Sequence, residues 1–365
     1  MPGKEISDIC IYCKDSEAIA SIRGRRLCRN CFIDYANSKA SRGMTSYRPH
    51  KNTATYKLLL PLSLGISSSS LLHMLDRLQQ RQVSASLGRA GYDVHVLIVD
   101  PSTIHPGHTD VQSNVDAVKA SFPRHTFTTV PLHSIFQYDA TIKDTLCDFG
   151  FVDEGFDSDK ARLDAFRASL STATARDDID NLLLVRLIVA FAKTNSCDGI
   201  VWGDSDSRLA AKTLANVAKG RGASTTWQVC DGVSPWGIDF CFPLRELYKF
   251  ELELYVQQLP ELASITVPDL QSQENSSNRN LSIDGLMNQY VKTQGEKYPG
   301  VMANVVRIVN KLQPISSNKQ DARCPLCSTP VERTALSGDN EASTISMCYA
   351  CLRSRADILQ DSSSN

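Results

Sequence analysis

The sequence has no long hydrophobic run and almost no net charge. No segment approaches the ~20 consecutive apolar residues of a membrane-spanning helix, so we expect no membrane partner. The opening stretch, MPGKEISDIC, is too polar for a secretory signal peptide. We therefore expect a cytosolic or nuclear protein, in which cysteines stay reduced. The 39 basic and 40 acidic residues nearly cancel, so the overall charge identifies no class of partner.

The loop at 63–75, SLGISSSSLLHML, lacks the residues of the common nucleotide-binding loops. It follows an apolar run and precedes a helix-like pattern, which is where a phosphate often binds. A P-loop requires GxxxxGK[ST], of which the lysine and the second glycine are missing, and the GxGxxG fingerprint is missing as well. The remaining template is the pyrophosphate loop SGGxDS of ATP-dependent adenylating enzymes, whose glycines let the backbone approach the phosphates.

Aligned with SGGxDS, this loop carries two unfavourable replacements. The first glycine is replaced by Leu64, whose side chain should crowd the backbone that would meet a phosphate. The aspartate is replaced by Ser67, which removes the carboxylate that would hold a magnesium ion. Ser63, Gly65, Ser67 and Ser68 still offer donors for weak anion binding. We therefore predict the remnant of a nucleotide loop without a catalytic residue, and we do not expect ATP as a cofactor of this chain.

The middle of the chain, from about 52 to 315, alternates strand-like and helix-like segments. Apolar runs predict strands at 56–64, 92–100, 126–132 and 197–205. Helical periodicity, with Pro243 at one start and a break near Pro299, predicts helices at 70–82, 111–122, 176–196, 207–220, 242–259 and 284–313. This alternation predicts an α/β fold, in which a parallel sheet is covered by helices on both faces. Such sheets bind ligands at the carboxyl ends of their strands.

Twelve cysteines in a reducing compartment indicate metal binding rather than disulfides. Eight of them form CxxC pairs near the two ends of the chain. The first quartet is Cys10, Cys13, Cys28 and Cys31, and the second is Cys324, Cys327, Cys348 and Cys351. Two CxxC turns supply the tetrahedral set of four sulfurs that zinc prefers, so we predict one structural zinc in each quartet. An iron–sulfur cluster, which also accepts four thiolates, is the alternative.

The other candidates for chemistry carry weaker signals. Without CxxC spacing, we expect none of the remaining cysteines to be catalytic: Cys147, Cys197, Cys230 and Cys241. Asp204 and Asp206 follow a predicted strand, where they could contact ATP or a metal, but capping of the next helix explains them equally well. His73 is expected to be packed or exposed rather than a ligand.

Basic residues gather around the first quartet. Residues 1–60 carry 11 Lys and Arg against 5 Asp and Glu. The residues that we predict to contact RNA are Arg23, Arg25, Arg26, Arg29, Lys39 and Arg42. Guanidinium groups held on a zinc hairpin suit phosphate contacts, although a solvated basic face would give the same pattern. The segment 321–365, with 4 basic and 6 acidic residues, has no such tendency.

Taken together, these motifs resemble the cytoplasmic tRNA 2-thiolation protein family, subunit two. The resemblance spans nearly the whole chain and is carried by CxxC…LCRNCF, LSLGISSSSLLHML, GDSDSRLAAKTLANVAKGRG, FPLRELYKFELELY and CPLC…CYAC. It implies a fold like the PP-loop ATPases of the HUP class, with a degenerate loop, between two zinc-ribbon-like modules. The implied divisions are a module at 1–50, an α/β domain at 51–315 and a module at 316–365.

The resemblance also implies a function and partners. The chain would be a mostly non-catalytic, cytoplasmic subunit that pairs as a heterodimer with the catalytic tRNA thiolase paralogue. It would support tRNA binding and the transfer of sulfur to the wobble uridine from a thiocarboxylated ubiquitin-like modifier. Two alternatives stay open: that the chain is itself an ATP-dependent tRNA sulfurtransferase, or that it is a zinc-ribbon adaptor without RNA contact.

Overall fold

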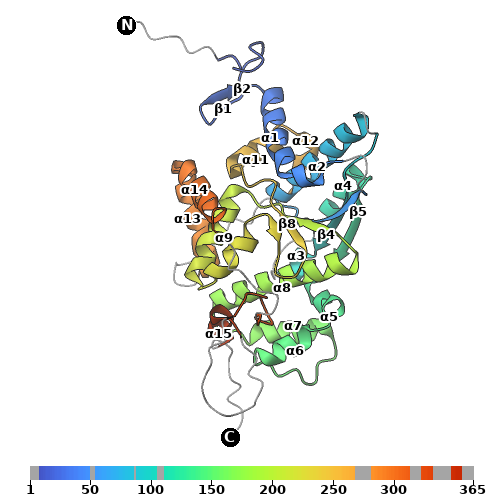
Figure 1. Cartoon of the computed structure of the whole chain (residues 1–365), viewed down its shortest axis with the longest axis vertical. Helices are drawn as coiled ribbons and strands as arrows, with labels where there is room; N and C mark the ends of the chain where they lie inside the picture. The colour runs from blue at the N-terminus through green and yellow to red at the C-terminus, as the bar shows by residue number, and fades with distance from the viewer. Residues whose placement is uncertain are drawn as a thin grey trace.

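A sheet of mostly parallel strands forms the centre of the molecule (Figure 1). The computed structural model describes residues 8–49, 54–85, 88–104, 111–267, 281–312, 322–331 and 347–355. Within them the order is β5 (Thr126–Val130), β4 (Tyr92–Val99), β3 (Tyr56–Pro61), β6 (Gly199–Val201), β8 (Asp239–Cys241) and β7 (Gly232–Val233). All neighbours in this order are parallel except β7, a short edge strand antiparallel to β8.

Alternate residues of the central strands enter two separate hydrophobic clusters. On β3, Leu58 and Leu60 belong to one cluster and Leu59 to the other. On β4, Val96 and Leu97 divide in the same way, because successive side chains of a strand point to opposite faces. Both faces of the sheet are therefore buried under helices, which confirms the predicted fold class.

The first face is covered by helices from the two halves of the chain. They are α1 (Arg29–Gly43), α2 (Ile66–Ser84), α4 (Gln112–Ser121), α11 (Lys249–Gln257) and α12 (Pro260–Ala263). The N-terminal hairpin, β1 (Ala20–Ile22) and β2 (Arg25–Leu27), leads directly into α1. Ile22, Leu27 and Phe32 share their hydrophobic cluster with the strands, so the first cysteine module extends this core.

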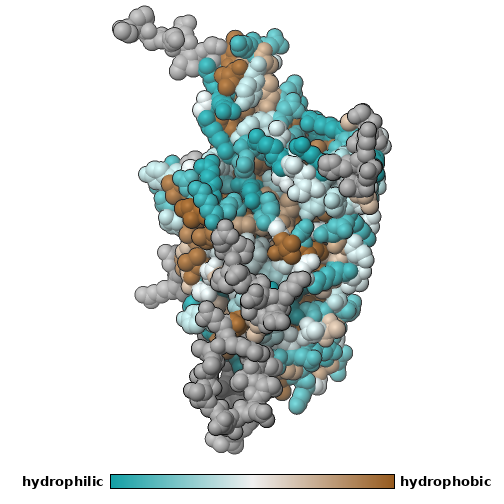
Figure 2. Space-filling model, in the orientation of Figure 1, coloured by the Kyte–Doolittle hydropathy of each residue, from teal (hydrophilic) through white to brown (hydrophobic). Residues whose placement is uncertain are grey.

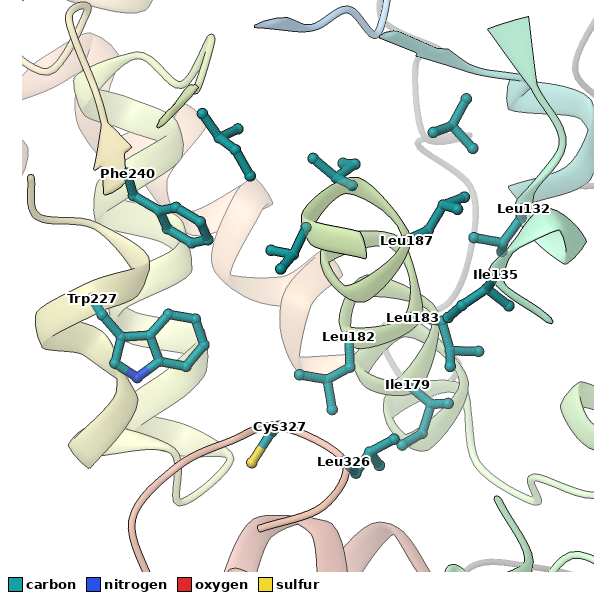
Figure 3. Close-up of a cluster of buried hydrophobic side chains, with 14 of the residues drawn as sticks. Leu132, Ile135, Ile179, Leu182, Leu183, Leu187, Trp227, Phe240, Leu326 and Cys327 are labelled. Atoms are coloured by element: carbon teal, nitrogen blue, oxygen red, sulfur yellow. The ribbon is translucent and has the colours of Figure 1, made fainter. Parts of the chain in front are cut away.

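The second face is built around the long helix α8 (Ala173–Thr194). The other elements here are α5 (Ile135–Tyr138), α6 (Ile142–Asp148), α7 (Asp159–Ala168), α9 (Asp206–Ala218), α13 (Ile283–Lys297), α14 (Pro299–Val309) and α15 (Tyr349–Arg355). Figure 3 shows Leu183 and Leu187 of α8 facing Leu132 and Ile135, with Leu326 and Cys327 of the second cysteine module packed below. The two modules thus join opposite cores, at opposite ends of the molecule (Figure 1).

Most predicted elements are present with shorter or shifted bounds. The break near Pro299 is confirmed, since α13 ends at Lys297 and α14 begins at Pro299. The helix predicted from Pro243 was wrong at its start: this proline lies in the turn after β8, and α11 begins at Lys249. The reason is a capping contact, in which the Glu251 carboxylate accepts a hydrogen bond from the Tyr248 amide at 2.9 Å.

The predicted boundaries between the modules lie outside the described residues, at 50/51 and 315/316. None of the helices in the described ranges combines the length and hydrophobicity that crossing a bilayer requires.

Candidate nucleic-acid interface and metal centres

The first cysteine quartet lies between the β1–β2 hairpin and the start of α1. Cys10 and Cys13 lie in the turn before β1, Cys28 is the N-cap residue of α1, and Cys31 is in its first turn. The four Sγ atoms lie within 4.8 Å of one another, and those of Cys13 and Cys28 are 3.7 Å apart. A tetrahedral ion with Zn–S bonds of ~2.3 Å holds its sulfurs about 3.8 Å apart. The quartet therefore fits a single metal ion.

The second quartet has the same geometry in a more buried setting. Cys324 and Cys327 belong to one turn. Cys348 immediately precedes α15, and Cys351 lies in the first turn of that helix. All four Sγ atoms again lie within 4.8 Å, and those of Cys327 and Cys348 are 3.4 Å apart. Both predicted quartets are therefore assembled in space.

Two buried arginines of the α/β domain hold the second quartet. Arg186 of α8 donates to the backbone carbonyls of Pro325 and Leu326, at 2.7 and 3.3 Å. Arg221 donates to the Sγ of Cys351 at 3.5 Å through both terminal nitrogens and forms an ion pair with Asp178. Burial would raise the pKa of Asp178, but the Arg221 guanidinium outweighs burial and lowers it. The cationic side chain therefore faces the Cys351 sulfur on one side and a carboxylate on the other.

Three of the six predicted RNA-contacting residues hold the N-terminal module against the α/β domain. Arg23 pairs with the fully buried Glu251 at 3.1 Å, Arg29 donates to the carbonyl of Gln258 at 2.6 Å, and Lys39 pairs with Glu246 at 2.6 Å. All three acceptors come from the region of α11, so the three side chains fasten the module to one place. Burial would lower the pKa of Arg23, but the Glu251 carboxylate raises it.

The turn of the hairpin explains why Arg23 reaches α11. Arg23 and Gly24 have φ values of 51° and 77°, the left-handed pair that a two-residue hairpin turn requires. The turn places the Arg23 guanidinium 4.0 Å from the centre of the Tyr248 ring, next to Glu251. Sequence reasoning missed this contact because the partners are separated by 228 residues.

The other predicted basic residues differ in how far they reach the surface. Arg26 is half-buried, whereas Arg25 and Arg42 are exposed. Arg25 donates to the phenolic oxygen of Tyr12 at 2.8 Å, and Arg42 lies 3.6 Å from Glu246. Both guanidinium groups are exposed, and among the described residues neither is held by a buried carboxylate.

Next to them, a cavity of about 680 Å³ opens between the hairpin and α1. Apolar side chains of the hairpin, four cations, two tyrosines and a metal-ligand cysteine contribute to its walls. Its lining is Tyr12, Ile22, Arg23, Arg25, Leu27, Cys31, Asp34, Tyr35, Ser38, Lys39 and Arg42. The predicted basic surface is thus concave and partly aromatic, which the sequence alone did not indicate.

The nucleotide-loop remnant lies between β3 and α2, at the carboxyl edge of the sheet. Leu64 keeps a left-handed backbone, with φ of 61°, and its side chain is completely buried in the first hydrophobic cluster. The expectation that Leu64 crowds the loop was therefore wrong, because its side chain points into the core and does not cover the loop. The hydroxyls of Ser63 and Ser68 lie 3.0 Å apart, and the Gly65 amide donates to Ser63.

The acids that follow β6 are engaged within the protein. Asp204 pairs with Lys212 at 2.5 Å, and Ser205, rather than either aspartate, caps α9. Asp206 is 1% exposed, and burial raises its pKa to about 7 although Ser207 donates hydrogen bonds to it. The suggestion that these aspartates cap the helix was therefore wrong. Ser67, the position of the missing carboxylate, is half-buried in the first turn of α2.

Three of the remaining candidates, His73, Cys197 and Cys241, are packed inside the fold. His73 is buried on α2 with Nδ1 2.9 Å from the Tyr255 hydroxyl, and burial lowers its pKa. Cys197 and Cys241 are buried, and burial raises the pKa of both thiols. These contacts agree with packing roles.

Comparisons with known proteins place this architecture. The chain is 49% identical to "Cytoplasmic tRNA 2-thiolation protein 2" of Aspergillus clavatus and 48% identical to that of Neosartorya fischeri; each match covers 98% of this chain and 100% of the relative. The family model described as "Cytoplasmic tRNA 2-thiolation protein 2" matches residues 282–347. Among solved structures, the U34-tRNA thiolase NcsA from Methanococcus maripaludis with its [4Fe-4S] cluster has the same fold. Its TM-score is 0.57 at 14% identity, over 99% of this chain and 100% of that chain. The chain belongs to the cytoplasmic tRNA 2-thiolation protein 2 family.

Proposed function

We propose that this chain is a mostly non-catalytic, cytoplasmic subunit of the machinery that 2-thiolates the wobble uridine of tRNA. The names of its relatives and the shared fold of a U34-tRNA thiolase support a role in tRNA thiolation. The observation that carries the non-catalytic part is the loop after β3, where Ser67 replaces the aspartate that would hold magnesium.

The surroundings of this loop support the same conclusion. Magnesium requires accessible oxygen ligands, usually carboxylates. Asp204 already pairs with Lys212, and Asp206 is buried with a pKa raised to about 7. The Ser63 hydroxyl bonds within the loop. Neither of these acids is therefore free to replace the lost carboxylate, and ATP binds to the partner instead.

The partner is the catalytic tRNA thiolase paralogue, which forms a heterodimer with this chain. It supplies the nucleotide site and receives sulfur from a thiocarboxylated ubiquitin-like modifier. A stripe of exposed apolar side chains on and after α14, Val301, Ile308 and Leu312, supports such pairing, because large exposed apolar patches often mark protein interfaces. Figure 2 shows brown side chains gathered over α13 and α14.

Each quartet holds one structural zinc ion. Four thiolates on a single ion lie closer together than four thiolates that bind different irons of a cluster, so the short Sγ separations of 3.7 and 3.4 Å support zinc. When bound, the ions stabilise modules that have small cores of their own. Metal analysis of the purified chain should therefore find about two zinc ions per chain.

Reconstitution of tRNA thiolation tests the proposal. This chain, the paralogue and their mixture are each supplied with tRNA, ATP and the thiocarboxylated modifier, and 2-thiouridine and ATP consumption are measured. We expect full activity only from the mixture, with Ser67→Ala close to the parent chain and Ile308→Glu defective in pairing. ATP consumption by this chain alone with tRNA would identify it as the sulfurtransferase, and pairing without tRNA contact would identify it as an adaptor.

A further inference from the structure

The cavity beside the first quartet has the size and chemistry of a nucleotide site. We propose that it takes one unpaired nucleotide of RNA, with the phosphate on Arg25 and Arg42 and the base against Tyr12. This inference rests on the proposed function, because it names the part of tRNA that the N-terminal module would bind. It assigns separate roles to residues that the sequence grouped only by charge.

The floor and the rim of the cavity differ. Ile22 and Leu27 of the hairpin lie beneath it, at 1% and 0% exposure, and close its floor. The Tyr12 ring, 51% exposed, comes from the turn between Cys10 and Cys13. A volume of about 680 Å³ lies within the range of small-molecule sites. The exposed Tyr12 ring at the rim offers the aromatic face on which a nucleobase can stack.

The charges at the cavity identify which cations can meet a phosphate. Arg23 and Lys39 are neutralised by Glu251 and Glu246. Arg25 instead donates to a neutral tyrosine hydroxyl, so its positive charge is not cancelled by that contact. The Arg42 side chain is 60% exposed and its nearest acid, Glu246, is 3.6 Å away and already held by Lys39. A guanidinium can bind two phosphate oxygens at once.

The one acid in the lining is engaged away from the cavity. Asp34 pairs with Arg81 of α2 at 3.1 Å, which offsets its charge. Lined in this way, the cavity favours an anion with an aromatic group attached. Bases in a duplex are paired and stacked, so they cannot enter it, whereas bases in loops and single strands can.

Binding measurements on the full-length chain test the assignment. Fluorescence anisotropy is recorded over a range of salt concentrations with three probes: a short single-stranded oligouridylate, a blunt RNA duplex and tRNA. The variants are Arg25→Ala, Tyr12→Ala, Tyr12→Phe and Ser38→Trp, which fills the cavity from α1. Arg48→Ala is the matched control, because Arg48 is exposed and belongs to the same basic stretch but does not line the cavity.

The phosphate and base contacts predict different signatures. Arg25→Ala should weaken oligouridylate binding about tenfold and reduce the slope of log affinity against log salt by about one. Tyr12→Ala should weaken it about tenfold with an unchanged slope, and Tyr12→Phe should stay within about twofold, because the ring remains. Ser38→Trp should abolish it without changing the charge. Duplex binding should change little in all four variants.

The nucleotide site would be overturned if the variants lost equal affinity for the duplex and the oligouridylate. It would also be overturned if Tyr12→Ala bound the oligouridylate as tightly as the parent chain. Metal content is measured for each variant because Tyr12 lies between two metal ligands, and Ser38→Trp blocks the cavity without altering that turn. If tRNA binding and reconstituted thiolation persist while the cavity variants behave like Arg48→Ala, the cavity assignment fails and the proposed function stands. If the parent chain binds no tRNA, the proposed RNA contact fails with it.

Discussion

Arg221 contacts Cys351 and Asp178 at once: both of its terminal nitrogens lie 3.5 Å from the Cys351 Sγ, and its Nε and Nη2 hold the Asp178 carboxylate. Lys219 also forms an ion pair with Asp178, at 2.9 Å, and another with Asp284 of α13. A metal bound by four thiolates carries a net negative charge, which is expensive to bury without a cation nearby. The Arg221 guanidinium would compensate this charge and links the quartet to α8 through Asp178, while Lys219 connects Asp178 to Asp284 of α13.

Replacing Arg221 should loosen metal at the second quartet only. Loss of a residue that supports a metal ligand typically lowers metal affinity about 10–100-fold. We expect the zinc affinity of the second quartet to fall by roughly that factor in Arg221→Ala. Arg221→Lys should be intermediate, because it keeps the charge but not the forked geometry. The rate of zinc transfer to a chelator measures this. The first quartet, at the far end of the molecule (Figure 1), is the internal control; equal acceleration at both quartets would show general destabilisation instead.

Leu64→Gly should destabilise the chain although glycine suits the backbone better. At φ of 61°, leucine costs about 1–2 kcal/mol relative to glycine. Its side chain, however, is 0% exposed, and removing a buried leucine costs about 3–5 kcal/mol. The packing loss exceeds the relief of strain, so we expect a net loss of about 1–4 kcal/mol in the free energy of unfolding. Urea unfolding measures it, and a variant more stable than the parent would contradict this balance.

The sequence was informative where spacing or continuous hydrophobicity determines structure. The runs that became β3 and β4 are apolar on both faces, and the CxxC spacing identified both quartets before their sulfurs were seen within 4.8 Å. The chemistry of the loop at Ser67 could likewise be read from residue identity alone.

The direction in which a side chain points, and partners that are distant in the sequence, could not be predicted in this way. The sequence shows that Leu64 replaces a glycine, but only the fold shows that its side chain enters the core. Arg23 looked like a free cation, and its partner Glu251 is 228 residues away. Pro243 matched a helix start, but the cap that Glu251 forms on the Tyr248 amide determined where α11 begins. Each of these depends on tertiary contacts that no local pattern encodes.

Glu251→Gln should release the N-terminal module from α11. Glu251 is fully buried, accepts from Arg23 and Tyr35, and caps its own helix at Tyr248. The charge that remains is Arg23, whose side chain is 28% exposed, so we expect a loss below the ~3–5 kcal/mol of a fully buried pair, roughly 1–3 kcal/mol. We expect faster amide hydrogen exchange in the hairpin at 20–27 and a lower melting temperature.

Lys39→Ala is the matched control for this prediction. Its partner Glu246 has a side chain 55% exposed, and exposed pairs contribute about 1 kcal/mol or less. The hairpin should therefore exchange at nearly the parent rate in Lys39→Ala. Similar exchange in both variants would mean that the buried pair does not dock the module.

Asp206 should make stability depend on pH below neutrality. Its pKa is about 7 in the folded chain, against an ordinary value of 3.8. The unfolded chain therefore releases this proton at lower pH than the folded chain, so between about pH 4 and 7 stability falls as pH rises, and above pH 7 the loss is complete. A difference of about three pH units corresponds to about 4 kcal/mol.

Asp206→Asn removes the proton while keeping an oxygen that can accept from Ser207. The variant should match the parent near pH 4.5 and exceed it by up to about 4 kcal/mol at pH 8, as measured by urea unfolding. Titration of the cysteines also changes stability over this range, but both chains contain the same cysteines and the difference between them cancels that effect. A stability difference that is the same at both pH values would show that Asp206 is ionised throughout, and that the buried carboxyl is stabilised by its neighbours more strongly than burial opposes it.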